Sequence, residues 1–333
     1  MSTVQHKPTL IVTVDTEEEG LWSPEFRAQG NTVANLRGAT RFQQLCDEFS
    51  IVPTYLIDTP VVEDKHAAGI LQEYHDSGRA EIGAHLHPWC TPPFIEELNG
   101  ANSFMCNLPE SVQEEKLANL TAGIEARFGR RPTSFRAGRY GLDMVGARIL
   151  SRLGYIVDSS VVPFNSYASE AGPDFSGAPV YPYFLDGEDI CRPHDAGFLL
   201  EVPVSYGFNR SSFRWAQRVL DAAMTPALRR FRVVGILDRL GVVRRIKFSP
   251  EQSGARAMKR LVDIYRKQEI PCLVMMMHSS SFCVGYSPYC STEEELERFY
   301  ADMRAIFDYC IRRCELQNQS LGGFASNFRQ RVG

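Results

Sequence analysis

The sequence has little of what usually marks a membrane-spanning or disulfide-rich protein. No stretch approaches the roughly 20 consecutive apolar residues that a membrane-spanning helix requires. The nine cysteines are an odd number, are scattered and form no CxxC pair, so we expect reduced thiols. The first apolar run is short and acids follow it directly, which is not the pattern of a secretory leader. We therefore expect a cytoplasmic protein.

Several short motifs of common enzymes are also absent. The sequence contains no GxGxxG and no GxxxxGK[ST], so it lacks the phosphate cradle of dinucleotide-binding and P-loop proteins. It has no GxSxG, which excludes the usual nucleophile elbow of serine hydrolases. An excess of positive charge is missing as well, because 36 Lys and Arg face 40 Asp and Glu for a net charge of −4. This balance argues against a nucleic-acid-binding protein.

What the sequence does contain is a regular alternation of two patterns. Seven short β-rich runs predict buried strands: Thr9–Val14, Ile51–Ile57, Glu81–Ala84, Ser134–Arg136, Tyr155–Val157, Leu199–Val204 and Cys272–Met277. Longer amphipathic segments between them predict helices: Ala34–Phe49, Lys65–Ser77, Pro109–Phe128, Asp143–Leu153, Gly254–Lys267 and Thr292–Cys314. Strand and helix in turn indicate an α/β protein with a parallel sheet, and about seven strands suit a closed or distorted barrel.

The net charge conceals a basic segment. Arg210–Lys247 contains ten basic and two acidic residues, a charge of +8, so the rest of the chain carries −12. Within this segment Arg214–Ala223 and Ala227–Leu240 have helical spacing. We expect residues 205–250 to form a basic helical insertion in a single barrel of residues 1–333, and Pro163–Tyr183 to form a long loop over the site.

Metal-competent residues follow two of the predicted strands. Asp15 and Glu17 come directly after the first strand, and His85 and His87 end the third. Side chains two apart on an extended segment point to the same side. Two histidines with a carboxylate form a recurrent site for a divalent metal. A solvated acidic loop and a chance histidine pair are the alternatives, and Cys90 is either a thiolate ligand or a buried filler.

Other polar residues stand at further strand ends. Arg136 and Arg139 follow the fourth strand, where an arginine needs a carboxylate partner and could lower the pKa of Asp15. Structural ion pairs are the alternative. Asp158 follows the fifth strand. His278 follows five apolar residues and is well placed for a general acid, although a lone histidine is often structural.

Taken together, these residues resemble the motifs of the polysaccharide deacetylase family, which is the NodB-homology or carbohydrate esterase family 4 group. The matching segments occur in the family's order: Thr13–Glu17, Ile82–Pro88, Phe135–Gly141, Asp158–Ser160 and Met276–His278. The resemblance implies a distorted (β/α)7 barrel of the NodB-homology type. It also implies a metal-dependent hydrolase that removes an N-acetyl or O-acetyl group from a carbohydrate.

Roles follow from the resemblance residue by residue. Asp15 is similar to the family's general base, Arg136 to the partner that orients it, His278 to the general acid and Asp158 to the aspartate that supports this acid. His85 and His87 resemble the metal ligands, with Zn²⁺ as the expected ion. The expected substrate-binding residues are Trp89, Arg139 and Tyr140.

Two positions depart from the family's motifs. Thr16 replaces the usual second aspartate, so Glu17 is the candidate metal carboxylate. The usual His-x-x-x-His spacing is shortened to His85-x-His87. A non-carbohydrate amidohydrolase of the same fold and a catalytically silent glycan-binding member are therefore alternative functions.

The basic segment suggests further partners. It could meet the phosphate of a nucleotide-linked or lipid-linked acetylated sugar, or an anionic membrane face. A solvated helical hairpin packed on the barrel is the alternative.

Overall fold

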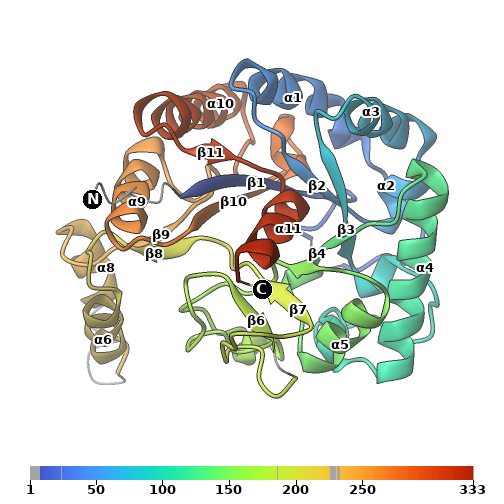
Figure 1. The fold of residues 1–333 in the computed structure, drawn as a ribbon, viewed down its shortest axis with the longest axis horizontal. Helices are drawn as coiled ribbons and strands as arrows, with labels where there is room; N and C mark the ends of the chain where they lie inside the picture. Colours follow the sequence, from blue (N-terminus) through green and yellow to red (C-terminus); the bar gives the residue numbers. More distant parts are fainter. Residues whose placement is uncertain (1–7, 24, 186, 226–229, 231–232, 333) are drawn as a thin grey trace.

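A computed structural model describes residues 8–332 except 24, 186, 226–229 and 231–232. Its main feature is a curled sheet in the order β10-β1-β2-β3-β4-β5-β7-β6, with β11 paired to β1 (Figure 1). All pairings are parallel except β6 with β7. The strands are β1 (Thr9–Thr16), β2 (Thr54–Ile57), β3 (Glu81–Leu86), β4 (Ser134–Ala137), β5 (Val157–Asp158), β6 (Tyr183–Leu185), β7 (Leu199–Glu201), β10 (Cys272–His278) and β11 (Gln317–Asn318).

Helices cover the outer side of this sheet (Figure 1). They are α1 (Ala39–Glu48), α2 (Thr59–Glu63), α3 (Lys65–Asp76), α4 (Glu110–Phe128), α5 (Met144–Arg152), α9 (Ala255–Lys267) and α10 (Glu293–Phe307). Asp64, Asp143 and Thr292 cap α3, α5 and α10 by accepting backbone N–H bonds. The seven predicted strands and the six predicted helical segments are therefore present, and the distorted (β/α) barrel is confirmed. Among the described helices, none is long and apolar enough to cross a membrane.

Helix α11 (Leu321–Val332) closes one end of the barrel. Its first backbone amides bond Thr54 and Glu81, which lie at the starts of β2 and β3. Leu321 and Phe324 join a buried cluster with strand residues that include Ile11 and Val274. Because this end is filled, the site lies at the opposite, carboxyl ends of the strands.

The basic segment begins and ends on an antiparallel pair, β8 (Tyr206–Phe208) with β9 (Arg245–Lys247). Between these strands lie α6 (Phe213–Ala223) and α8 (Val233–Arg239) at one corner of the molecule (Figure 1). Helix α6 matches the predicted segment Arg214–Ala223. The other predicted segment, Ala227–Leu240, lies partly outside the described residues.

Candidate active site

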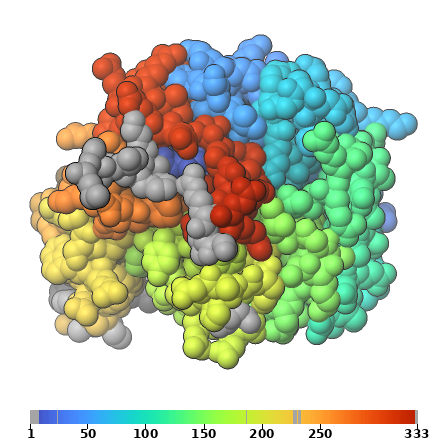
Figure 2. All heavy atoms as spheres, in the orientation of Figure 1, coloured from blue at the N-terminus to red at the C-terminus, as the bar shows by residue number. Residues whose placement is uncertain are grey.

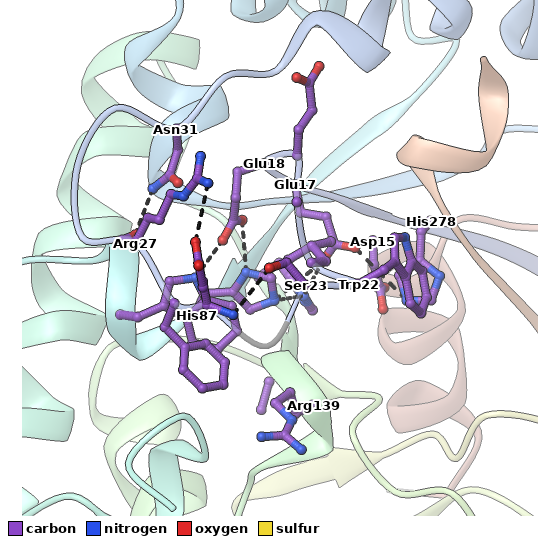
Figure 3. Close-up of a pocket in the computed structure, with 18 of the residues that line it drawn as sticks. Asp15, Glu17, Glu18, Trp22, Ser23, Arg27, Asn31, His87, Arg139 and His278 are labelled. Atoms are coloured by element: carbon purple, nitrogen blue, oxygen red, sulfur yellow. Dashed lines mark hydrogen bonds and ion pairs between the residues drawn. The ribbon is translucent and has the colours of Figure 1, made fainter. Parts of the chain in front are cut away.

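Strand register brings the predicted site residues together. Asp15 on β1 is level with His278 on β10, and His85 on β3 is level with Arg136 on β4. In a parallel sheet these side chains emerge at the same edge. Here they meet at one pocket of about 360 Å³, whose lining includes Asp15, Glu17, His85, His87 and His278 (Figure 3).

Three ligand atoms converge at the centre of this pocket. Glu17 Oε2 lies 3.1 Å from His85 Nε2 and 3.3 Å from His87 Nε2. The two imidazole nitrogens are 3.2 Å apart. Neighbouring ligand atoms on a Zn-sized ion, with bonds of about 2.1 Å, lie roughly 3.0 Å apart in an octahedral site and roughly 3.4 Å apart in a tetrahedral site. The observed spacings fall between these two values.

Glu18 fixes how His87 presents its ring. The Glu18 carboxylate accepts a bond from His87 Nδ1 at 2.9 Å and another from Trp89 Nε1 at 2.6 Å. Burial, and then the neighbouring His85, lower the pKa of His87 well below its usual value, so the ring is neutral. Since Nδ1 carries the proton toward Glu18, the lone pair of Nε2 faces Glu17. This is the arrangement of a carboxylate–histidine–metal triad.

The residues present fit a divalent metal ion. Oε1 of Glu17 is buried and lacks a hydrogen-bond partner in the described structure. Burial raises the pKa of Glu17 well above its usual value, and the neighbouring carboxylates of Asp15 and Glu18 raise it further, against the lowering effect of His278. A cation among these carboxylates would relieve that penalty.

A second buried group, Glu18 with Asp58, His87 and Cys90, has metal-competent atoms close together. Glu18 and Asp58 already accept hydrogen bonds there.

Asp15 is held by Arg136. Arg136 Nη1 donates to Asp15 Oδ1 at 2.6 Å, and the rest of the guanidinium donates to the backbone oxygen and hydroxyl of Ser159. Burial opposes ionisation of Asp15, but the charge of Arg136, with smaller effects of His85 and His278, lowers its pKa to about 2. Asp15 is therefore an oriented carboxylate at neutral pH.

His278 is supported by Glu251, and the prediction that Asp158 supports it is wrong. Nδ1 of His278 lies 2.9 Å from Glu251 Oε2, and its backbone amide donates to Oε1 at 3.0 Å. Burial opposes the imidazolium, but Glu251 and then Glu17 raise the pKa of His278 to about 9. Nε2 lies 3.9 Å from Glu17 Oε1, so it faces the candidate metal site.

Asp158 lies instead in a separate buried network. Its two carboxylate oxygens accept bonds from the hydroxyl and the backbone amide of Ser160. Burial raises the pKa of Asp158, and burial together with Asp158 raises that of Glu201. Two such carboxyl groups share a proton most readily. The Ser160 hydroxyl donates to Asp158 and accepts a bond from the Ala137 amide, so the network supports the turn after β4.

That turn carries two of the three predicted substrate-binding residues. Arg139 and Tyr140 have φ of 52° and 59°, which is uncommon for residues with a side chain. A Cβ on Gly138 would lie 2.1 Å from His87 Cδ2, so only glycine allows this ring to sit so close. Arg139 lines the pocket, but its guanidinium pairs with Glu170 and contacts Ser103. Tyr140 lines the pocket and accepts a bond from Lys247 Nζ at 2.7 Å.

The segment that covers the pocket is not the predicted one. Residues of the stretch 19–31, including Trp22, Phe26 and Arg27, line the pocket wall (Figure 3). Trp22 meets the His278 ring edge-on, with centroids 5.3 Å apart. Trp89, also a predicted substrate-binding residue, is nearly buried and stacks on His87. The loop Pro163–Tyr183 contributes Glu170 as partner of Arg139 but is not part of the pocket wall.

Reasoning from the sequence missed Glu251, Glu18 and Lys247. Lys247 ends β9 and Glu251 follows it, in a stretch that precedes the motif Met276–His278 and contains no motif of its own. Burial lowers the pKa of Lys247 to about 8 against the raising effect of Glu251 and Asp15. Glu18 stands in the acidic run after β1, where its contact with His87 could have been considered.

No family model matches the sequence, and no curated protein matches it significantly. Solved structures do share its fold. A candidate polysaccharide deacetylase from Mycobacterium smegmatis aligns with a TM-score of 0.57 and 16% identity over 99% of this chain and 93% of its own. A candidate glycoside hydrolase/deacetylase from Parabacteroides distasonis aligns with a TM-score of 0.61 and 14% identity, over 99% of this chain and 73% of its own. The chain therefore has the fold found in these two proteins, as the resemblance implied.

Proposed function

We propose that this protein is a metal-dependent hydrolase that removes an acetyl group, N-linked or O-linked, from a carbohydrate. One observation carries the proposal. The converging atoms of Glu17, His85 and His87 share one pocket with a held carboxylate, Asp15, and a charged imidazole, His278. Hydrolysis of an unactivated amide or ester is helped by a base, a metal ion and an acid within reach of the same carbonyl group.

The metal would be held by Glu17, His85 and His87. When bound, a divalent cation such as Zn²⁺ supplies Lewis acidity, which polarises a carbonyl group and makes water more acidic. The chain's own residues hold the ligands in the orientation and tautomer that coordination requires. Glu18 holds the proton of His87 at Nδ1, so that Nε2 stays free to coordinate.

Asp15 takes the proton from the attacking water. Arg136 occupies Oδ1, so Oδ2 is left to accept that proton. The water oxygen bonds to the acetyl carbon, and the carbonyl oxygen gains negative charge. A preorganised donor such as a backbone amide near Arg139 and Tyr140 would stabilise this charge.

His278 supplies the second proton. Its pKa of about 9 keeps it protonated at neutral pH, and Glu251 holds the Nδ1 side, so Nε2 is the donor. The proton passes to the leaving nitrogen or oxygen as its bond to the acetyl carbon breaks. The products are acetate and the free amine or hydroxyl group.

The pocket favours an uncharged sugar. Five carboxylates line it, those of Asp15, Glu17, Glu18, Glu19 and Glu25, while its two arginines already have carboxylate partners. These arginines are therefore not free to pair with a phosphate group, which would have to bind beside the carboxylates. We therefore expect any nucleotide or lipid-pyrophosphate group of the substrate to lie outside it.

Acetate release tests the proposal. Purified protein is assayed with acetylated mono-, oligo- and nucleotide sugars, and with small non-carbohydrate acetamides. Asp15→Asn should lower kcat by roughly 10²–10⁴, because it removes the proton acceptor. The exposed variant Asp76→Asn is the control and should be fully active. Full activity of Asp15→Asn would contradict the mechanism, hydrolysis of acetamides alone would favour the amidohydrolase, and glycan binding without turnover would favour the silent member.

A further inference from the structure

The corner formed by α6 and α8 exposes unusual side chains. Ten large apolar side chains are exposed in the described part of the chain, and five of them lie between residues 215 and 240. We call the following residues the α6–α8 surface: Arg214, Trp215, Arg218, Met224, Val234, Ile236 and Leu240. Leu240, at 71% exposed, and Ile236, at 51%, are among the most exposed of the large apolar residues. In Figure 2 this corner, in yellow and light orange, forms the edge of the molecule.

Trp215 is not needed to hold α6 in place. Helix α6 has a separate inner face, Phe213, Ala216, Leu220 and Ala223, which is buried at helical spacing. Phe213 packs there against Phe208 of β8 and other aromatic rings. Trp215 therefore lies on the solvent side of an already packed helix, where an indole ring usually indicates an interaction.

The same surface carries positive charge that the chain does not neutralise locally. Arg214 and Arg218 are exposed, and neither has a carboxylate partner among the described residues. Of the two acids in the segment, Asp238 pairs with Arg244 and Asp221 accepts a bond from Gln217. Arg214 and Arg218 are therefore available to an external anionic partner.

We propose that the α6–α8 surface docks on the surface of an anionic lipid bilayer. Arginines beside tryptophan and aliphatic residues on short helices are typical of segments that lie in the membrane interface. The guanidinium groups meet lipid phosphates, and the apolar side chains enter the boundary between headgroups and acyl chains.

Two other partners fit less well. A symmetric dimer through this surface would bring two basic patches face to face, because a twofold interface pairs the same patch with itself. Nucleic acid would be attracted by the arginines, but exposed Ile236 and Leu240 would gain little from a phosphate backbone.

The insertion is also linked to the pocket. Lys247, at the foot of this insertion on β9, donates to Tyr140 in the pocket wall. Docking itself does not depend on the proposed function. Only the consequence that a lipid-linked acetylated sugar is presented to the pocket rests on it.

Vesicle co-sedimentation tests the proposal on the full-length protein. Phosphatidylcholine vesicles are compared with vesicles that also contain phosphatidylglycerol, at low and high salt. Binding should require the anionic lipid and weaken at high salt. Each arginine at such a surface contributes about fivefold to partitioning, so Arg214→Gln with Arg218→Gln should reduce it about 25-fold. The matched control is Lys65→Gln with Arg130→Gln, which removes the same charge from another face.

A second variant tests the apolar part. Trp215→Ala should weaken binding to anionic vesicles without changing acetate release from soluble sugars. No binding at low salt, or equal loss in the control pair, would overturn the proposal. So would variants that change the oligomeric state and leave lipid binding intact, since the surface would then serve a protein partner.

Discussion

Glu18 determines which ring nitrogen of His87 carries the proton. It accepts the Nδ1 proton of His87 at 2.9 Å, and its other oxygen is bonded by Trp89 at 2.6 Å. Without this carboxylate, His87 could carry its proton on Nε2, where it would block coordination.

Glu18→Gln should therefore lower the affinity for a divalent metal about 10–100-fold. Titration of the metal-free protein with Co²⁺, followed by calorimetry and by the visible absorption spectrum, measures this directly. Glu63→Gln, an exposed change on α2, is the control and should bind as the wild type does. Unchanged Co²⁺ affinity and spectrum in Glu18→Gln would show that the tautomer of His87 is set by other contacts.

Glu251 should set the alkaline limit of activity. It raises the pKa of His278 to about 9, and a group with a raised pKa is protonated below it and loses its proton as the pH rises through it. In Glu251→Gln the pKa of His278 falls, so the alkaline limb of the kcat profile should move to lower pH. If the alkaline limb stays in place in Glu251→Gln, a group other than His278 causes it. Glu294→Gln, an exposed change, is the control and should leave the limb where it is.

The predicted residues that the structure brings to one pocket share a local pattern. Asp15, His85 and His278 each end an apolar run, so the strand and its polar end are visible in a few consecutive letters. Glu251 lacks such a pattern, because its contact with His278 depends on how the residues after β9 pack against the end of β10. Asp158 was misassigned for the same reason: its place in the motif order did not show that Ser160 and Glu201 would be its neighbours.

Among the elements, α11 has the clearest structural role. Reasoning from the sequence did not identify it, since its glycines at 322 and 323 weaken the helical pattern. Gly322 nevertheless suits its place, because a Cβ there would lie 2.5 Å from Glu81 Oε1. The helix closes the barrel end with Leu321 and Phe324.

Leu321→Ala should lower the free energy of unfolding by about 2–5 kcal/mol, because it leaves a cavity under the strands. Denaturant unfolding followed by circular dichroism measures the loss. Leu240→Ala, at a position 71% exposed, is the control and should change little. A wild-type midpoint for Leu321→Ala would mean that α11 does not stabilise the barrel.

The segment that covers the pocket, within residues 19–31, was not predicted from the sequence. The composition of Pro163–Tyr183 suggested the loop over the site, but the residues directly after β1 are the ones that line the pocket. They begin within the acidic motif itself, so they start beside the candidate metal ligand Glu17.

At the scale of the molecule, charge is divided between two parts. The body carries −12 and Arg210–Lys247 carries +8, so the net value of −4 describes neither. The barrel was predictable because strand and helix alternate along the chain. Its pocket was predictable only in part, because a parallel sheet brings distant strand ends together but does not say which loops cover them.

Measurement of the metal content tests the proposed metal site. The wild-type protein, equilibrated with Zn²⁺ and dialysed, should retain one divalent ion per chain. A His85→Ala, His87→Ala variant of unchanged circular dichroism should lose both the ion and acetate release. An ion retained in that variant, or a wild-type protein that binds none, would contradict the assignment of Glu17, His85 and His87 as the metal site.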